Sequence, residues 1–170
     1  MRPDQLSREL REGDGSDLER RRWIVGLSPV GVAMGAVVGL YQTGVLRRLP
    51  SLPSDLFDAE RVDASDYAYS RLQTPDGLLM IASYAFTAIL AGAGGRERAR
   101  DYPVLPLALA AKTLYDSYIA IKLGREEWQE NEALCDYCQT ATLASLASAG
   151  LAVPEAVEAA RTLLDGHARH

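Results

Sequence analysis

The sequence predicts an all-α integral membrane protein, a four-helix bundle whose N- and C-termini are cytoplasmic. Three observations support this fold class. Apolar and charged residues are sorted into separate blocks, although the mean hydropathy of −0.09 is typical of a soluble protein. Four apolar blocks are long enough to cross a hydrocarbon core of about 30 Å at about 1.5 Å per helical residue. Lys and Arg gather in alternate polar segments, which indicates an orientation.

Length and composition limit the possible functions. The chain has 170 residues and a net charge of −5, so its charge gives no reason to expect a nucleic-acid partner. We divide it into a polar N-terminal arm, a membrane domain and an amphipathic C-terminal tail, at residues 1–22, 23–153 and 154–170. The two cysteines cannot form a disulfide scaffold, but they can form one redox-active pair.

The first apolar run, residues 23–45, contains no charge. It opens with Trp23 and closes near Tyr41, and both residue types favour membrane interfaces. Basic residues before an apolar run are also typical of a secretory signal, but no small-x-small cleavage site follows, so we expect an uncleaved anchor. Three glycines spaced four residues apart form a ladder along one face of this helix, and they should let another helix backbone approach closely: Gly31, Gly35 and Gly39.

Three further apolar runs alternate with polar loops. A connection at residues 46–76 contains several prolines and leads into the second run. Pro154 follows the fourth run and is expected to begin a short separate helix. The three runs are residues 77–95, 104–123 and 134–153.

The distribution of basic residues predicts that both termini are cytoplasmic. The N-terminal arm, the loop at 94–103 and the tail together hold more Lys and Arg than the other two loops. We therefore expect a multi-pass protein of the inner membrane. The alternative is a soluble helical protein whose core helices are unusually apolar.

Cys135 and Cys138 form a C-x-x-C motif at the start of the fourth run. One helical turn brings both sulfurs onto the same face, and the free amides of a first turn stabilise a thiolate. The predicted orientation places the pair on the outer side, where thiols can cycle oxidatively. Two alternatives are half of a zinc site, which only His167 and His170 could complete, and two unrelated apolar thiols.

These features together resemble the vitamin K epoxide reductase family and its bacterial homologues. The resemblance rests on four spans, a C-x-x-C opening the last of them, and a long loop between the first and second. The stretch "VDASDYAYSRLQTPDGL", residues 62–78, is similar to the family's run from that loop into the second span. The residues that fall close to the family pattern are Val62, Ser65, Tyr67, Ala68 and Pro75.

The resemblance implies a membrane thiol oxidoreductase that passes two electrons from a dithiol to a quinone, without a metal. It implies that Cys138, the deeper cysteine, faces the quinone and that Cys135 exchanges with the incoming thiol. Ser65 would match a loop hydroxyl beside the active site. Asp76 stands where many members carry an asparagine that hydrogen-bonds the quinone oxygen, and a protonated Asp could still donate.

The sequence departs from the family in the first loop. Most members carry a second cysteine pair there, and the expected position of one of these is Ala59. Without that pair, no internal disulfide exchange can feed the C-x-x-C. Either an external thiol or a thioredoxin-like donor reaches Cys135 directly, or the chain is a catalytically degenerate subunit that binds a quinone or partner helices.

Lys112 and Asp116 lie one turn apart inside the third run. Ionisable groups at this depth are costly unless they pair or line a cavity. One interpretation is that Asp116, with Tyr115, delivers protons to a reduced quinone; the other is an internal ion pair that fixes helix packing. We also assign Tyr84, in the second run, to the candidate quinone-binding residues.

Overall fold

The computed structural model of the chain describes residues 2–167, apart from the side chains of Tyr67 and His167 and the exposure of Gly166. Every regular element in this part of the chain is a helix, which confirms the all-α class. The elements are α1 (Pro3–Glu12), α2 (Ser16–Gln42), α3 (Ala59–Asp63), η1 (Asp66–Tyr69), α4 (Asp76–Gly92), α5 (Arg98–Asp101), α6 (Val104–Asn131) and α7 (Asp136–His167).

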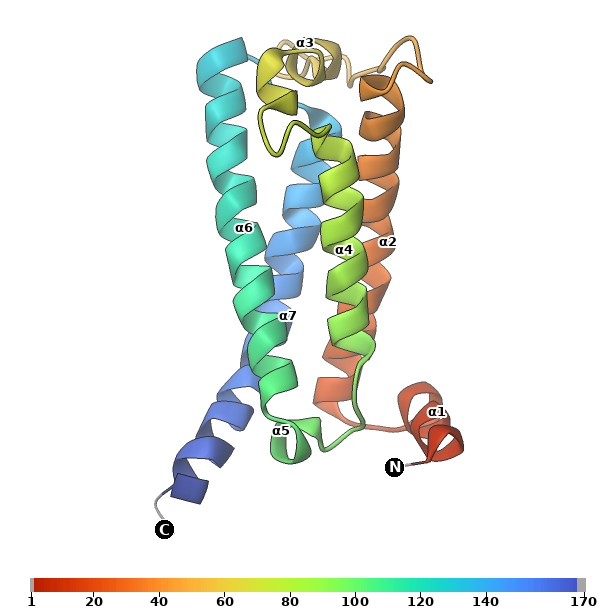
Figure 1. Cartoon of the computed structure of the whole chain (residues 1–170), viewed down its shortest axis with the longest axis vertical. Coiled ribbons are helices and arrows are strands. Elements are labelled where there is room, and N and C mark those ends of the chain that lie inside the picture. Colours follow the sequence, from red (N-terminus) through yellow and green to blue (C-terminus); the bar gives the residue numbers. More distant parts are fainter. Residues whose placement is uncertain (1, 168–170) are drawn as a thin grey trace.

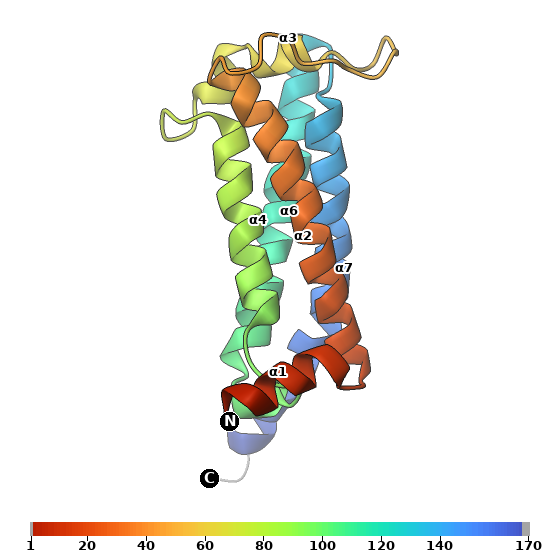
Figure 2. The same cartoon turned by 90° about the vertical axis from the view of Figure 1, so that its right-hand side faces the viewer.

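The helices α2, α4, α6 and α7 run side by side along the long axis (Figures 1 and 2). The short α3 and the loops around it cover one end, while α1, α5 and both termini lie at the other (Figure 1). Extensive packing joins α2 to α4, α2 to α7, and α6 to α7, whereas α4 and α6 touch only sparsely. Because α4 and α6 make so few contacts, the helix bundle is open on the side between these two helices.

Three of the described helices, α2, α6 and α7, are long and apolar enough to cross a membrane. The helix α4 is also apolar, but it has 17 residues, which corresponds to about 25 Å. The described chain therefore has the composition of a multi-pass membrane protein, with three candidate spans where the sequence predicts four.

Helix boundaries differ from the expected ones at three places. The helix α2 begins at Ser16, inside the polar arm, and α6 continues to Asn131, eight residues beyond its apolar run. This extension consists largely of good helix formers and ends where Glu132 adopts a left-handed φ of 50°. The expected break at Pro154 is absent, because α7 continues through it along an alanine-rich sequence that favours helix on both sides.

The glycine ladder of α2 lies directly against α4. A Cβ atom at Gly77 would lie 2.3 Å from the Gly39 nitrogen and 2.6 Å from the Gly35 carbonyl oxygen. At the third rung, Gly31 faces the ring of Tyr84. The two backbones can approach this closely only because none of these positions carries a side chain.

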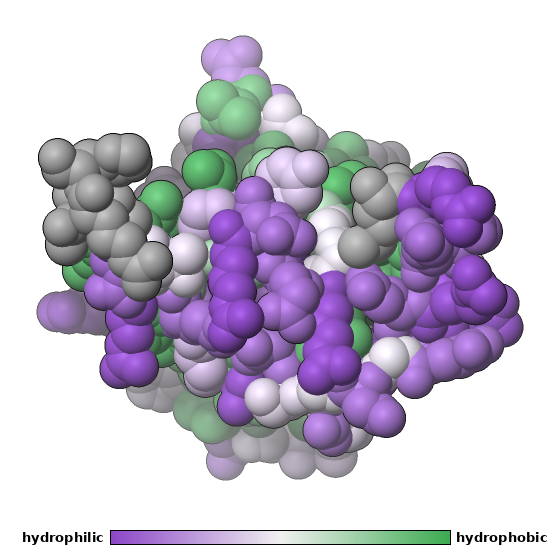
Figure 3. Space-filling model, turned by 90° about the horizontal axis from the view of Figure 1, so that it is seen from below, coloured by the Kyte–Doolittle hydropathy of each residue, from purple (hydrophilic) through white to green (hydrophobic). Residues whose placement is uncertain are grey.

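The end that carries the termini is polar, as its hydrophilic surface shows (Figure 3). Beneath this surface, Arg98 forms a bidentate ion pair with Glu155, with N–O distances of 2.7 and 2.6 Å. Arg98 and Arg21 also donate to backbone carbonyls around the end of α4, including Ala91 and Ala93. Two buried guanidinium groups thus satisfy the carbonyls that the end of a helix leaves without partners.

Replacing Gly77 by alanine should destabilise the fold by about 1–3 kcal/mol, because the new methyl group overlaps the α2 backbone. Unfolding of the purified protein by SDS in mixed micelles measures this change. The matched control is Gly26→Ala on α2, where an added Cβ meets no atom within 4 Å. Equal stability of the two variants would contradict the backbone contact.

Candidate thiol and cavity site

The two cysteines lie at the start of α7 and are free thiols. Cys135 immediately precedes the helix and Cys138 lies in its first turn, where its backbone N–H donates to Cys135 Sγ at 3.2 Å. Hydrogen bonding with Cys138 favours the Cys135 thiolate, but burial and nearby Asp63 outweigh this effect and raise the pKa of Cys135. The raised pKa therefore favours the protonated thiol of Cys135 over its thiolate at neutral pH.

Cys135 is 0% exposed and packs in one cluster with Val38, Leu49, Ala59 and Val62. The segment between Leu49 and Ala59, residues 50–58, which we call the strap, is hydrogen-bonded to residues on either side of Cys135. The Leu134 N–H donates to the Leu56 carbonyl at 3.0 Å, and the Asp58 N–H donates to the Leu134 carbonyl at 3.1 Å. Further along, the Tyr137 hydroxyl donates to the Pro50 carbonyl at 2.6 Å. Because Cys135 is fully buried, an external thiol cannot contact it unless this part of the loop moves.

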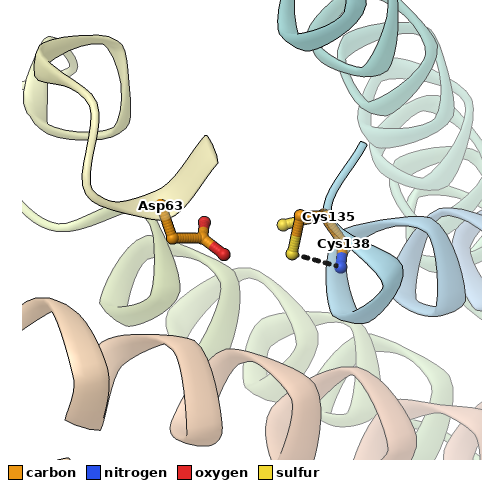
Figure 4. Close-up of side chains that lie close together, drawn as sticks. All are labelled: Asp63, Cys135 and Cys138. Atoms are coloured by element: carbon orange, nitrogen blue, oxygen red, sulfur yellow. Dashed lines mark hydrogen bonds between the residues drawn. The ribbon is translucent and has the colours of Figure 1, made fainter. Parts of the chain in front are cut away.

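Asp63, the last residue of α3, points its carboxylate toward the two sulfurs (Figure 4). The ligand atoms of Asp63, Cys135 and Cys138 all lie within 4.8 Å of one another. Asp63 is 2% exposed, and its Oδ2 has no hydrogen-bond partner among the described residues. Burial raises the pKa of Asp63 to about 6, against the opposing effect of hydrogen bonding from Cys135.

Asp63 is not among the site residues predicted from sequence, whereas Ser65 of the same stretch is. The Ser65 hydroxyl donates to the Val62 carbonyl at 2.6 Å, within its own turn. In the described part of the chain, no hydrogen bond connects it to either cysteine. The available signal for Asp63 was an acidic residue inside the segment that carries the family resemblance.

A cavity of about 230 Å³ opens between α4, α6 and α7. Its lining includes five of the seven sequence-predicted site residues, while Cys135 and Ser65 lie outside it. The five are Asp76, Tyr84, Tyr115, Asp116 and Cys138. Much of the remaining wall is apolar, with side chains of Leu79, Met80, Ile119, Ala120 and Leu123. The cavity thus places one sulfur of the pair against an apolar chamber.

Several polar groups of the cavity already have partners in the protein. Asp76 pairs with Arg71 at 2.6 Å, so the carboxylate is engaged and the guanidinium also lines the chamber. The Tyr84 hydroxyl donates to the Ala141 carbonyl and lies 2.8 Å from Ser145 Oγ. Arg71 is a cavity residue that sequence reasoning did not select, because it lies in the irregular loop before α4.

Lys112 and Asp116 form an ion pair that also joins α6 to α4. Lys112 Nζ donates to the Ser83 carbonyl at 2.6 Å and to the hydroxyl of Thr87. The Ser83 hydroxyl donates to Asp116 Oδ2 at 3.1 Å. This cluster connects the two helices that otherwise touch sparsely, and Asp116 lines the cavity at the same time.

The thiol pair could also hold a metal ion, with Asp63 as the third donor. The side chain of His167 and the whole of His170, which the zinc interpretation requires, lie outside the described residues. Two sulfurs and one carboxylate supply three ligands, whereas structural zinc usually has four. The geometry fits an open three-donor set and adds no support for histidine ligation.

The sequence model of the vitamin K epoxide reductase family matches residues 22–153, which include the thiol pair, the strap and most of the four long helices. The chain belongs to the vitamin K epoxide reductase family. No curated protein and no solved structure matches it. Family membership, together with the apolar helices, supports an oxidoreductase of thiols and disulfides in a membrane.

Removing the Tyr137 hydroxyl should expose Cys135, because the strap loses its bond to Pro50. A Tyr137→Phe change in a Cys138→Ala background should speed maleimide labelling of Cys135 by about two- to tenfold, the value of one hydrogen bond. The control is Tyr102→Phe, an exposed tyrosine at the opposite end. Unchanged labelling in both variants would show that this bond does not hold the strap closed.

Proposed function

We propose that this member of the vitamin K epoxide reductase family is a thiol oxidoreductase that transfers two electrons from the Cys135–Cys138 dithiol to a quinone. The observation that carries the proposal is the position of Cys138. Its side chain contributes to the wall of the cavity, while Cys135 is fully buried at the loop end, outside the cavity lining. One sulfur is therefore available to a ligand in the cavity and the other to a donor that approaches from the loop end.

The cavity suits the ring of a quinone, which is a flat apolar body with two carbonyl acceptors. Apolar side chains from α4 and α6 form two of its walls, and Arg71 supplies a donor. Its volume suits a ring better than a whole lipid-tailed molecule. The tail would leave through the opening between α4 and α6, beside the Lys112 cluster that joins the two helices.

Electrons enter by disulfide exchange at Cys135. A thiolate of the donor attacks Cys135 Sγ, the Cys135–Cys138 bond breaks, and its electron pair leaves on Cys138. A second donor thiolate then attacks the mixed disulfide and releases Cys135. The donor is oxidised to a disulfide, the protein pair is reduced, and closing the pair again passes two electrons to the quinone.

We also propose that the family fold lies in the inner membrane with four spans, the thiol end outward and both termini cytoplasmic. The Lys and Arg distribution supports this orientation. The hydrophilic end with α1, α5 and the termini is consistent with a surface in contact with water (Figure 3). The helix α4 would cross together with its flanking residues, since the helix alone is short.

Replacing either cysteine by alanine should abolish steady-state oxidation of a dithiol by a quinone, because neither variant can form the intramolecular disulfide. The assay follows quinone reduction by absorbance in detergent or proteoliposomes. Wild-type turnover in both variants would overturn the redox assignment. If the wild-type protein itself shows no turnover, the chain is instead a non-catalytic subunit, as the missing loop cysteines and the buried Cys135 would allow.

Filling the cavity should weaken quinone use without disturbing the thiols. Ala120→Trp on α6 places a large ring in the chamber, and we expect the KM for quinone to rise at least about tenfold, the loss of about 1.4 kcal/mol. Thiol titration of the same protein should be unchanged. The control is Ala111→Trp, at an exposed position on the same helix; equal kinetic effects of the two would contradict a quinone in this cavity.

A further inference from the structure

Asp63 occupies a position that calls for a chemical explanation. A carboxylate that is 2% exposed usually has a full set of hydrogen bonds or a basic partner. Here Oδ2 has no partner among the described residues. Removing such a group from water without compensation costs free energy, so the position is unfavourable for folding alone.

The electrostatic surroundings of Asp63 also lack a compensating cation. The ionisable side chains that act on it from neighbouring elements are Cys135, Asp76 of α4 and Asp136 of α7. Glu127 of α6 and Tyr41 of α2 lie close enough to interact with its charge. Among the described residues, this surrounding set is acidic or weakly acidic throughout. Asp63 therefore does not serve as half of an ion pair.

The thiol pair needs a group with the properties of Asp63. Disulfide formation requires a thiolate, yet burial and local charge favour the protonated form of Cys135. The carboxylate lies within 4.8 Å of both sulfurs and points toward them (Figure 4). A buried base with a free oxygen beside a buried thiol is the arrangement that general base catalysis requires.

We infer that Asp63 is the general base that accepts the proton of Cys135 when the dithiol closes to a disulfide. The inference rests on the proposed function and names a further residue for the same site. It gives Asp63, at the last position of α3, a role in the redox chemistry, although the loop that contains α3 has no cysteine.

The Cys138 thiol first adds to the quinone ring: a C–S bond forms, and the thiol proton passes to a quinone oxygen. The S–H bond of Cys135 then breaks and its proton passes to Asp63, while the electron pair stays on sulfur. The Cys135 thiolate attacks Cys138 Sγ, so that the S–S bond forms, the C–S bond breaks and its electron pair leaves with the quinone ring. The two thiol protons, the second of them by way of Asp63, equal the two that the quinone takes up on reduction to the hydroquinone.

Single-turnover oxidation of the reduced protein by a short-chain ubiquinone analogue tests the role. Asp63→Asn keeps the shape of the side chain and removes the base, and the rate should fall at least about 100-fold. Asp63→Glu should recover part of the rate, since it restores a carboxylate. The matched control is Asp66→Asn, three residues away at an exposed position, which should react as the wild type does.

The pH dependence supplies a measurement that a structural role would not change. Only ionised Asp63 can accept a proton, so the wild-type rate should fall as the pH drops through about 6. Asp63→Asn should lose this inflection. A second test uses Asp63→Ala, whose rate should increase when formate is added to replace the missing carboxylate.

Two controls keep folding separate from chemistry. Each variant is tested for thermal unfolding and for disulfide formation with diamide, an oxidant that does not use the cavity. If Asp63→Asn folds, forms the disulfide with diamide and also reacts with quinone at the wild-type rate, the inference is overturned. The same holds if formate fails to restore Asp63→Ala while that variant remains folded.

The cysteine variants separate this failure from failure of the proposed function. If Cys138→Ala is inactive and Asp63→Asn has wild-type kinetics, only the role of Asp63 is lost. If Cys138→Ala retains full turnover, the redox function fails first, and any effect of Asp63→Asn then reports structure alone.

Discussion

The cavity depends on the contact between the backbones of α2 and α4. Because Gly35, Gly39 and Gly77 carry no side chains, α4 lies directly against α2 and not midway between its neighbours. The separation from α6 follows from this placement, since α6 is held by α7. In a membrane, where lipid is as apolar as the helix faces, such fitted contacts decide which helices pair. The chamber beside Cys138 is the space that this pairing leaves.

Polar groups then define the two ends of that space. At the cytoplasmic end of the proposed orientation, Arg21 and Arg98 hold the carbonyl end of α4. At half height the Lys112 cluster joins α4 to α6. At the thiol end, Arg71 holds Asp76 at the start of α4. A helix too short to fill the bilayer by itself is thus fixed along its length by charged side chains from other segments.

Patterns along the helices predicted much of the site, whereas contacts of the loop could not be read from sequence. Apolar runs and the C-x-x-C located the helices and the thiol pair, and the cost of an ionisable group inside an apolar run selected Asp116. Asp63 was missed because its position depends on the pairing of the strap with Leu134, a contact between residues far apart in sequence. Helix ends were missed where charged residues continue a helix that apolar runs do not mark, as in α6.

The covered position of Cys135 has a kinetic consequence for electron supply. When a reactive sulfur is reached only after a segment opens, the rate of reduction rises with donor concentration and then levels off at the opening rate. Abundant small thiols gain little from their concentration under this regime. A folded donor that binds the strap and holds it open gains most, so the same segment that shields the sulfur also selects which protein may reduce it.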